Sequence, residues 1–233
     1  MMKFIKSLTI LMAIGASNAH ADDFSLFIGA DFEYSLIKAS GDWDRVVSKV
    51  YSGGNGFAGC RLSEYIGFEI GYEFTGKKDK AHEFVLGETF FSLPNTSFIG
   101  TNTQIQTSFN GWHVDLLGFI PLDHCIDLLL IGGYGAMKLK SQFHVLTGPF
   151  PLLNDAILSI NSKGRTFLRL GGGIQWMVTD MTGVRALLRW QNTNRLTIRG
   201  NSNFGSVLIA NNISSKIYKD AVTAAVGVFF RFY

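Results

Sequence analysis

Charged side chains recur at odd-numbered positions of this 233-residue chain, in segments whose even-numbered positions are apolar. The residues that we take as the candidate functional site are Asp31, Glu33, Glu69, Glu73, Asp115, Arg169, Arg185 and Arg189. The same odd-numbered set also contains Arg61, His113, Asp127, Gln175, Gln191 and Arg231. Because side chains of a β-strand alternate between its two faces, these residues would share one face of a sheet. Buried charges are stable only when paired, so we expect a network of ion pairs on that face.

His113 and Asp115 form the pair that most resembles catalytic machinery. Two residues apart on one strand, an imidazole and a carboxylate could act as an acid/base pair. However, the pattern fixes no nucleophile beside them, and a site inside a barrel would not reach lipid or protein substrates. We therefore interpret the pair as part of an interior polar network and expect no enzymatic activity. An enzyme acting on lipid or peptide stays as a third hypothesis, behind two non-enzymatic ones.

Metal, cofactor and nucleic-acid sites find no support in the sequence. The histidines beyond the N-terminal segment, which are His82, His113, His124 and His144, are dispersed without metal-ligand spacing. Glycine runs at 132–133 and 171–173 lack the lysine and helix of a phosphate loop, and they predict close packing or bends within strands. The formal net charge is +3, and loss of Lys3 and Lys6 with a leader segment would leave +1 (3 − 2), with no basic cluster. We therefore expect no metal, no cofactor and no nucleic-acid partner.

Strict alternation predicts the fold. Apolar side chains occupy even positions across 24–36, 66–74, 112–120, 128–136, 168–176, 184–190 and 222–232, and a weaker segment lies around Gly54–Leu62. A period of two over such lengths indicates β-strands with one apolar face. We predict an all-β fold, an eight-stranded antiparallel transmembrane β-barrel with up-and-down order and both termini on the periplasmic side.

Two kinds of barrel fit this alternation, because the pattern does not say which face is inside. A soluble barrel such as a lipocalin would turn the apolar face inward, whereas a membrane barrel would turn it toward lipid. Three features favour the membrane barrel. Short links at 63–64, 121–126 and 179–182 alternate with long connections at roughly 38–53, 76–105, 139–164 and 192–217, as in outer-membrane barrels. Aromatic residues lie at both ends of the apolar face, where they would form interfacial girdles.

The third feature is the placement of proline. Pro94, Pro121, Pro149 and Pro151 would all fall in connections, since a proline in a closed barrel forfeits a ladder hydrogen bond that lipid does not replace. We therefore expect the loops near residues 45, 90, 150 and 205 to face outside. The turns at Ser63, Asp123 and Asp180 would then face the periplasm.

Residues 1–21 carry the features of a signal peptide. Lys3 and Lys6 precede an apolar stretch from Leu8 to Ala16, and Ala19-His20-Ala21 fits the small-x-small cleavage pattern. The alternative is a membrane anchor, but the apolar stretch is about half of the ~20 residues that a spanning helix needs. We expect cleavage after Ala21, a barrel domain over 22–233, and localisation in the Gram-negative outer membrane.

The two cysteines, Cys60 and Cys125, would reside in an oxidising compartment. On the second and fifth predicted strands they are about three inter-strand spacings of ~4.8 Å apart. That separation exceeds the ~7 Å limit between the Cα atoms of a disulfide, so we expect two unpaired thiols.

Several segments resemble the OmpA-like transmembrane β-barrel family. They are Gly56–Leu62, Tyr65–Phe74, Leu117–Pro121, Phe167–Gln175, Arg185–Asn194 and Val226–Phe232. The last resembles the terminal strand that directs such proteins to the barrel-assembly machinery, although here Tyr233 follows the outward aromatic residue Phe232. The sequence shows no counterpart of the peptidoglycan-binding domain of OmpA itself, so a stand-alone barrel of the OmpX or opacity-protein type is the closer match.

The resemblance implies that Glu69 and Arg185 match an interior Glu–Arg pair that acts as a gate or a structural bridge. We expect Glu69 and Glu73 to pair with Arg185 or Arg189. Apolar residues on the same face would fill the bore of eight strands, namely Phe27, Leu117, Leu129, Ile131, Phe167, Leu187 and Phe229.

The function expected from the sequence is that of an integral outer-membrane barrel whose external loops serve adhesion, host-factor interaction or envelope integrity. The alternative is a small porin-like channel for ions or small solutes. The expected partners are outer-membrane lipids and lipopolysaccharide, the assembly machinery during insertion, and host or surface ligands bound by the loops.

Overall fold

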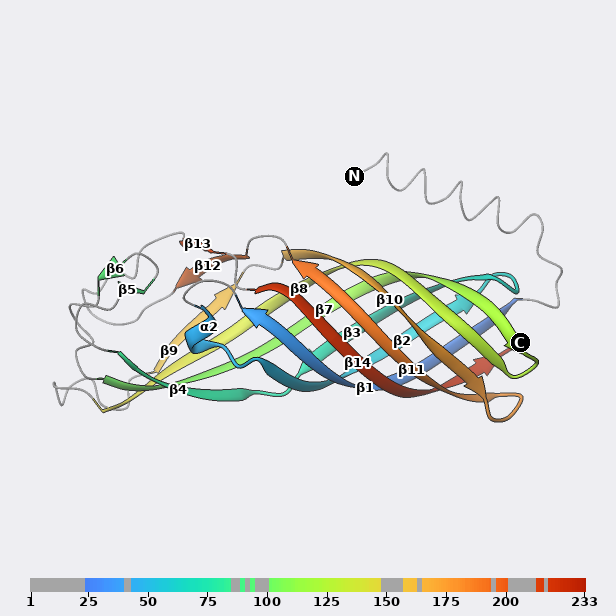
Figure 1. The fold of residues 1–233 in the computed structure, drawn as a ribbon, viewed down its shortest axis with the longest axis horizontal. Helices are drawn as coiled ribbons and strands as arrows, with labels where there is room; N and C mark the ends of the chain where they lie inside the picture. Colours follow the sequence, from blue (N-terminus) through green and yellow to red (C-terminus); the bar gives the residue numbers. More distant parts are fainter. Residues whose placement is uncertain are drawn as a thin grey trace.

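Eight strands close into a barrel (Figure 1). The computed structural model describes residues 24–39, 43–84, 89–90, 93–94, 101–147, 157–162, 165–193, 196–200, 213–215 and 218–233. In chain order the barrel strands are β1 (Ser25–Ala39), β2 (Val50–Arg61), β3 (Ile66–Thr75), β7 (Thr101–Asp123), β8 (Ile126–Thr147), β10 (Arg165–Met177), β11 (Thr182–Thr193) and β14 (Tyr218–Phe232). Each pairs antiparallel with the next, and β14 pairs with β1. The predicted eight-stranded up-and-down barrel is confirmed.

The remaining elements lie at one end of the barrel (Figure 1). The sheet is extended there by β4 (Lys78–Phe84), β9 (Ile157–Ser162), β12 (Leu196–Gly200) and β13 (Ile213–Ser215). A separate pair consists of β5 (Thr89–Phe90) and β6 (Leu93–Pro94), and α2 (Trp43–Val46) is a single helical turn. We call this the long-loop end.

Among the described residues no helix is long and apolar enough to span a membrane.

The opposite end, which we call the turn end, holds short links at 62–65, 124–125 and 178–181. Leu26 pairs with Phe232, so β1 begins and β14 ends at this end of the barrel. The predicted alternation of short and long connections is therefore present. The predicted signal peptide, residues 1–21, and the predicted loop centres near 150 and 205 lie outside the described residues.

Three details of the sequence prediction were wrong. The second strand begins at Val50 rather than at Gly54, and Cys125 lies in the β7–β8 turn rather than on a strand. Pro121 lies inside β7, although it was expected in a connection. Pro94 lies in the two-residue strand β6, within the predicted connection 76–105, and Pro149 and Pro151 lie outside the described residues. Pro121 is tolerated because the ladder shifts register between it and Asp123, and such an irregularity leaves room for a residue without an N–H. Cys60 and Cys125 are both free thiols.

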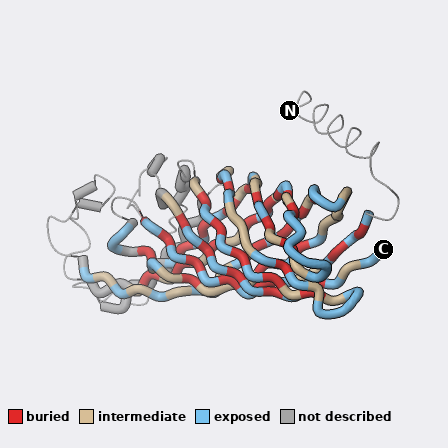
Figure 2. The backbone as a smooth tube through the Cα atoms, turned by 45° about the vertical axis from the view of Figure 1, so that its right-hand side comes forward, coloured by how far each residue is buried: buried red, intermediate tan, exposed pale blue. Residues whose placement is uncertain are grey.

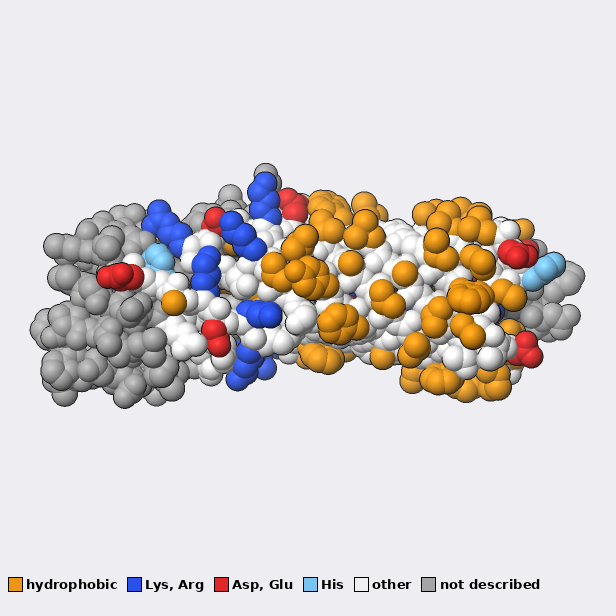
Figure 3. Space-filling model, turned by 60° about the horizontal axis from the view of Figure 1, so that its bottom comes forward, with side chains coloured by type: hydrophobic (Ala, Val, Ile, Leu, Met, Phe, Trp, Pro, Cys, Tyr) orange, Lys and Arg blue, Asp and Glu red, His pale blue; other side chains and the backbone are white. Residues whose placement is uncertain are grey.

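The two faces of the barrel wall differ as strict alternation demands. Buried residues alternate with exposed ones along most of the wall, although much of β2 is of intermediate exposure (Figure 2). Large apolar side chains such as Phe32, Leu168 and Val226 are about three-fifths exposed on the outside. On the face that Figure 3 shows, hydrophobic side chains gather over the part of the barrel between the charged zone and the turn end. Exposed large apolar side chains also come from seven of the eight barrel strands, and we call this zone the hydrophobic band. The apolar face therefore points outward, which excludes the soluble barrel and fits a wall that faces lipid.

The interior contains two apolar layers. The lower layer, toward the turn end, consists of Phe27, Phe57, Leu117, Phe119, Leu129, Ile131, Leu187, Ala225 and Phe229. The ring of Phe27 lies 6.3 Å from that of Phe57 and 6.4 Å from that of Phe229. All seven apolar residues predicted to fill the bore are buried, including Phe167. The sequence pattern did not single out Phe57 and Phe119.

The upper layer lies toward the long-loop end and includes Val47, Tyr51, Ile105, Phe109 and Leu139, all of them buried. The rings of Tyr51 and Phe109 meet edge to face with centroids 5.0 Å apart, and the Tyr51 hydroxyl lies 2.5 Å from the Thr107 hydroxyl. Along β1, Phe27 belongs to the lower layer and Ile37 is buried at the level of the upper one. The charged residues Asp31 and Glu33 lie between them.

Adjacent glycines on β8 provide a matched test of interior packing. A Cβ on Gly133 would collide with the Asp115 carboxylate and lie 2.8 Å from the Val114 carbonyl oxygen, whereas a Cβ on Gly132 meets no atom within 4 Å. We expect Gly133→Ala to lower the free energy of unfolding by about 1–3 kcal/mol, as overpacking does. We expect Gly132→Ala to change it by less than about 0.5 kcal/mol. Urea unfolding in lipid vesicles measures both, and equal effects would contradict the packing described here.

Candidate functional site

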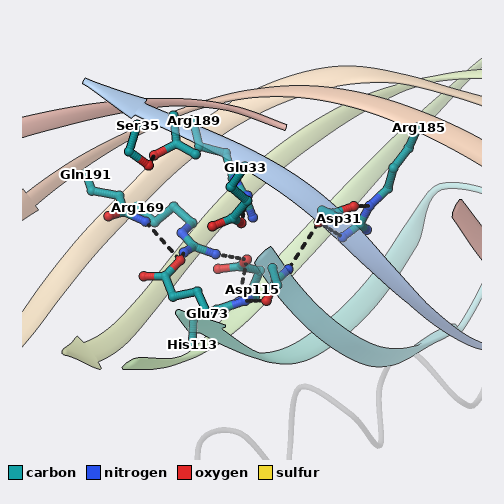
Figure 4. Close-up of polar contacts among 12 residues, drawn as sticks. Asp31, Glu33, Ser35, Glu73, His113, Asp115, Arg169, Arg185, Arg189 and Gln191 are labelled. Atoms are coloured by element: carbon teal, nitrogen blue, oxygen red, sulfur yellow. Dashed lines mark hydrogen bonds and ion pairs between the residues drawn. The ribbon is translucent and has the colours of Figure 1, made fainter. Parts of the chain in front are cut away.

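The predicted charged residues meet in the lumen (Figure 4). Along the bore they lie between the two apolar layers. They project from β1, β3, β7, β10 and β11, and each is less than a tenth exposed. The strand register places them at similar heights, since Asp31 lies opposite Asn55 and Glu69 lies opposite Asp115. We call this set, together with Asn55, His113 and Gln191, the lumen network.

Arg185 joins two carboxylates from different strands. Its Nε and Nη2 atoms donate to the two oxygens of Asp31 at 2.8 and 2.7 Å. Its Nη1 and Nη2 atoms donate to the Glu69 carboxylate at 2.5 and 3.2 Å. The guanidinium carbon also lies 3.4 Å from the centroid of the Phe57 ring. Paired charge-assisted hydrogen bonds of this kind fix geometry as well as charge, so Arg185 ties β1, β3 and β11 together.

Arg169 forms the second centre. It is fully buried, pairs with Glu73, and donates from Nη1 to Asp115 at 3.1 Å. The Gln191 amide, oriented with its oxygen toward Arg169, accepts from Nε at 3.1 Å and from Nη2 at 2.7 Å. Arg189 pairs with Glu33. The expectation that Glu73 would pair with Arg185 or Arg189 was therefore wrong, because the stagger of the strands brings Arg169 to its height.

His113 links the two halves of the network. Asn55 donates from Nδ2 to Asp31 at 3.1 Å, which leaves its Oδ1 to face the His113 Nε2 atom at 3.0 Å. His113 must therefore donate through Nε2, since Asn55 Oδ1 only accepts. The other ring nitrogen, Nδ1, lies 2.9 Å from Asp115. His113 and Asp115 thus lie within the interior polar network, and the absence of a catalytic role for the pair stays a prediction.

Three members of the network could hold a metal ion on geometric grounds. Ligand atoms of Glu69, His113 and Asp115 all lie within 4.8 Å of one another. Sequence spacing did not reveal this group, because Glu69 comes from a neighbouring strand. Both carboxylates already accept hydrogen bonds from guanidinium groups, Glu69 from Arg185 and Asp115 from Arg169. The ion pairs therefore account for the cluster, and the absence of a resident metal stays a prediction.

A smaller polar group lies near the turn end. Arg61 donates to Asp127 at 2.8 Å, and Gln175 donates to the same carboxylate at 3.2 Å. The Arg61 guanidinium stacks over Phe119 at 4.3 Å from the ring centroid. The odd-numbered pattern had placed these polar residues on the inner face, but did not separate them from the lumen network.

A closed barrel with an apolar outer band and a charged, paired interior defines a transmembrane protein of the outer membrane. The chain belongs to the outer membrane protein β-barrel domain family, whose model matches residues 7–230. The family confirms the resemblance drawn from the sequence and the localisation in the Gram-negative outer membrane.

Solved structures are similar to this chain at low sequence identity. A major outer membrane protein from Thermus thermophilus is 14% identical over 91% of this chain and 100% of its own, with a TM-score of 0.60. Ail of Yersinia pestis, solved in complex with the heparin analogue sucrose octasulfate, is 16% identical over 90% of this chain and 99% of its own, with a TM-score of 0.49. No curated protein matches the chain in sequence.

The Glu33–Arg189 pair allows a test of charge pairing in the lumen. Arg189→Met would leave the buried Glu33 carboxylate without its cation, so we expect it to lower the free energy of unfolding by about 3–5 kcal/mol. The double variant Glu33→Gln/Arg189→Met removes both charges, and we expect it to recover at least half of that loss. Urea titrations in lipid vesicles give both values. Additive losses in the double variant would contradict a direct pair.

Proposed function

We propose that the protein is a closed outer-membrane barrel whose role lies at the long-loop end, in adhesion, host-factor interaction or envelope integrity. The observation that carries this proposal is the filled lumen. An apolar layer, a paired charge network and a second apolar layer follow one another along the bore. A barrel with such an interior has little room for a solute path, so its outward-facing surfaces and loops are the places left for contact with other molecules.

The long strands support the same proposal. From Trp112 in the aromatic zone, β7 continues to Thr101, which is about 35 Å along the strand at ~3.3 Å per residue. β8 runs beside it from Tyr134 to Thr147. A hydrogen-bonded hairpin of this length would hold the loops clear of the membrane surface. In this orientation both termini face the periplasm, a signal peptide over residues 1–21 is removed, and the strand ending at Phe232 engages the assembly machinery.

The channel remains the second candidate because of one feature. A cavity lined in part by Glu33, Ser35, Glu73, Gln191 and Thr223 lies on the long-loop side of the network. Polar walls of this kind suit water and small ions. Conduction would require both the ion pairs below the cavity and the Tyr51–Phe109 layer above it to move aside. Catalysis lacks a comparable feature among the described residues, since His113 and Asp115 are engaged by the network.

Electrical recording separates the two candidates. We expect purified protein in planar lipid bilayers to show no steady conductance, because the paired network and both apolar layers fill the bore. Arg185→Ala removes the cation shared by Asp31 and Glu69, and we expect it to produce brief openings. Lys38→Ala, which removes an exposed charge on the outer face of β1, is the matched control and should stay silent. Large, steady conductance of the wild type would overturn the closed barrel and favour the channel.

A further inference from the structure

A basic patch lies on the outer face of the barrel at the long-loop end. It consists of Lys77, in the β3–β4 link, and Lys138 and Lys140, on β8, and all three side chains are exposed. Positively charged side chains gather in the zone between the hydrophobic band and the far end of the molecule (Figure 3). Lys77 is distant in sequence from the other two lysines, and the sequence alone indicated no basic cluster.

The strand register brings these lysines together. Lys138 lies opposite Asn110, and Lys140 lies opposite Ser108, so both project outward beside β7. Lys78 pairs with the inward-facing Thr107, which places the preceding Lys77 on the outer face, on the other side of β7. Residues two apart on a strand are ~6.6 Å apart, and two inter-strand spacings are ~10 Å. The backbone positions of the three lysines therefore lie roughly 7–12 Å apart on the same part of the outer face.

The patch lies directly above the aromatic zone of the band. Asn110 donates from Nδ2 to the Tyr72 hydroxyl at 2.7 Å, and Tyr72 lies opposite Trp112 in the ladder. Tyrosine and tryptophan mark the level of lipid headgroups in membrane proteins. The three lysines are therefore positioned where phosphates of the surrounding lipid would lie, and the side chains of Asn110 and Ser108 could donate further hydrogen bonds.

The three lysines form no ion pair with a described carboxylate. One exposed carboxylate, Asp79, lies two residues from Lys77, and it accepts a hydrogen bond from Gln106 at 2.9 Å. The turn end differs, because its links carry the exposed carboxylates Glu64, Asp123 and Asp180. The two rims of the barrel thus differ in charge, as they would if they met leaflets of different composition.

We propose that the basic patch binds the phosphate groups of the glycolipid of the outer leaflet, that is, the phosphorylated lipid A part of lipopolysaccharide. Lysine ammonium groups bind phosphate as point charges, and the flanking amide and hydroxyl suit a sugar–phosphate headgroup. This proposal rests on the orientation given under the proposed function, in which the long-loop end meets the outer leaflet. Lipopolysaccharide was already an expected partner from the sequence, and the proposal adds the site and the residues that bind it.

The test measures lipid binding by the full chain in detergent with native mass spectrometry. Bis-phosphorylated lipid A, the same lipid without phosphates, and phosphatidylglycerol are each titrated against the protein. We expect Lys138→Gln/Lys140→Gln to weaken lipid A binding by about tenfold or more. Lys38→Gln/Lys49→Gln is the matched control, because Lys38 lies on β1, four strands away around the ring, and should stay within about twofold of the wild type.

Three results would overturn the proposal. They are equal lipid A affinity of the wild type and the Lys138/Lys140 variant, equal affinity of the wild type for the lipid without phosphates, and equal affinity for phosphatidylglycerol. The migration of folded and heated protein on gels shows whether each variant is folded. The orientation is checked separately with native Cys125, which is exposed in the β7–β8 turn. A membrane-impermeant maleimide should label Cys125 only after cells are permeabilised. Labelling of Cys125 on intact cells would refute the orientation and would leave the measured lipid affinities unchanged.

Discussion

Lipid offers the polypeptide backbone no hydrogen-bond partner, and this constraint determines the rest of the structure. Every strand in the hydrophobic band must find two neighbours, so the sheet closes through the pairing of β1 with β14. Closure with eight strands sets a narrow bore and divides each strand into a lipid-facing and a lumen-facing set of residues. The apolar band, the buried charges and the position of the loops all follow from that division.

The lumen-facing set has to satisfy a second condition, because charges inside a narrow bore have little water to solvate them. Five carboxylates and three guanidinium groups meet there, and each of the three arginines pairs with at least one carboxylate. Apolar layers on both sides limit access of water to these pairs, which strengthens their attraction. The network therefore links strands that are distant in sequence, and it also blocks the bore.

The alternation of residue types was enough to predict the strands and their two faces. The inward direction of the charged face was predicted from other features, chiefly the alternation of short and long connections and the aromatic residues at both ends of the apolar face. The partners within the lumen were harder to predict, since they depend on strand stagger and tilt. Glu73 reaches Arg169 for this reason, and Asn55 gains its role only because Asp31 and His113 lie on either side of it. The position of Lys77 was not predicted because residues 76–77 lie between β3 and β4 and break the alternation. Odd-numbered side chains face the lumen in β3 but face outward in β4. Pro121 was misplaced because a local register shift leaves no signature in the alternation.

The central claim is that the arginines of the lumen network are sealed from water by paired carboxylates and apolar layers. Hydrogen exchange of individual guanidinium groups, followed by NMR with the protein in lipid nanodiscs, tests it directly. We predict that the side-chain N–H signals of Arg169, Arg185 and Arg189 persist long after that of the exposed Arg45 on α2 has exchanged. If the three lumen arginines exchange as fast as Arg45, water fills the bore and the closed barrel is contradicted.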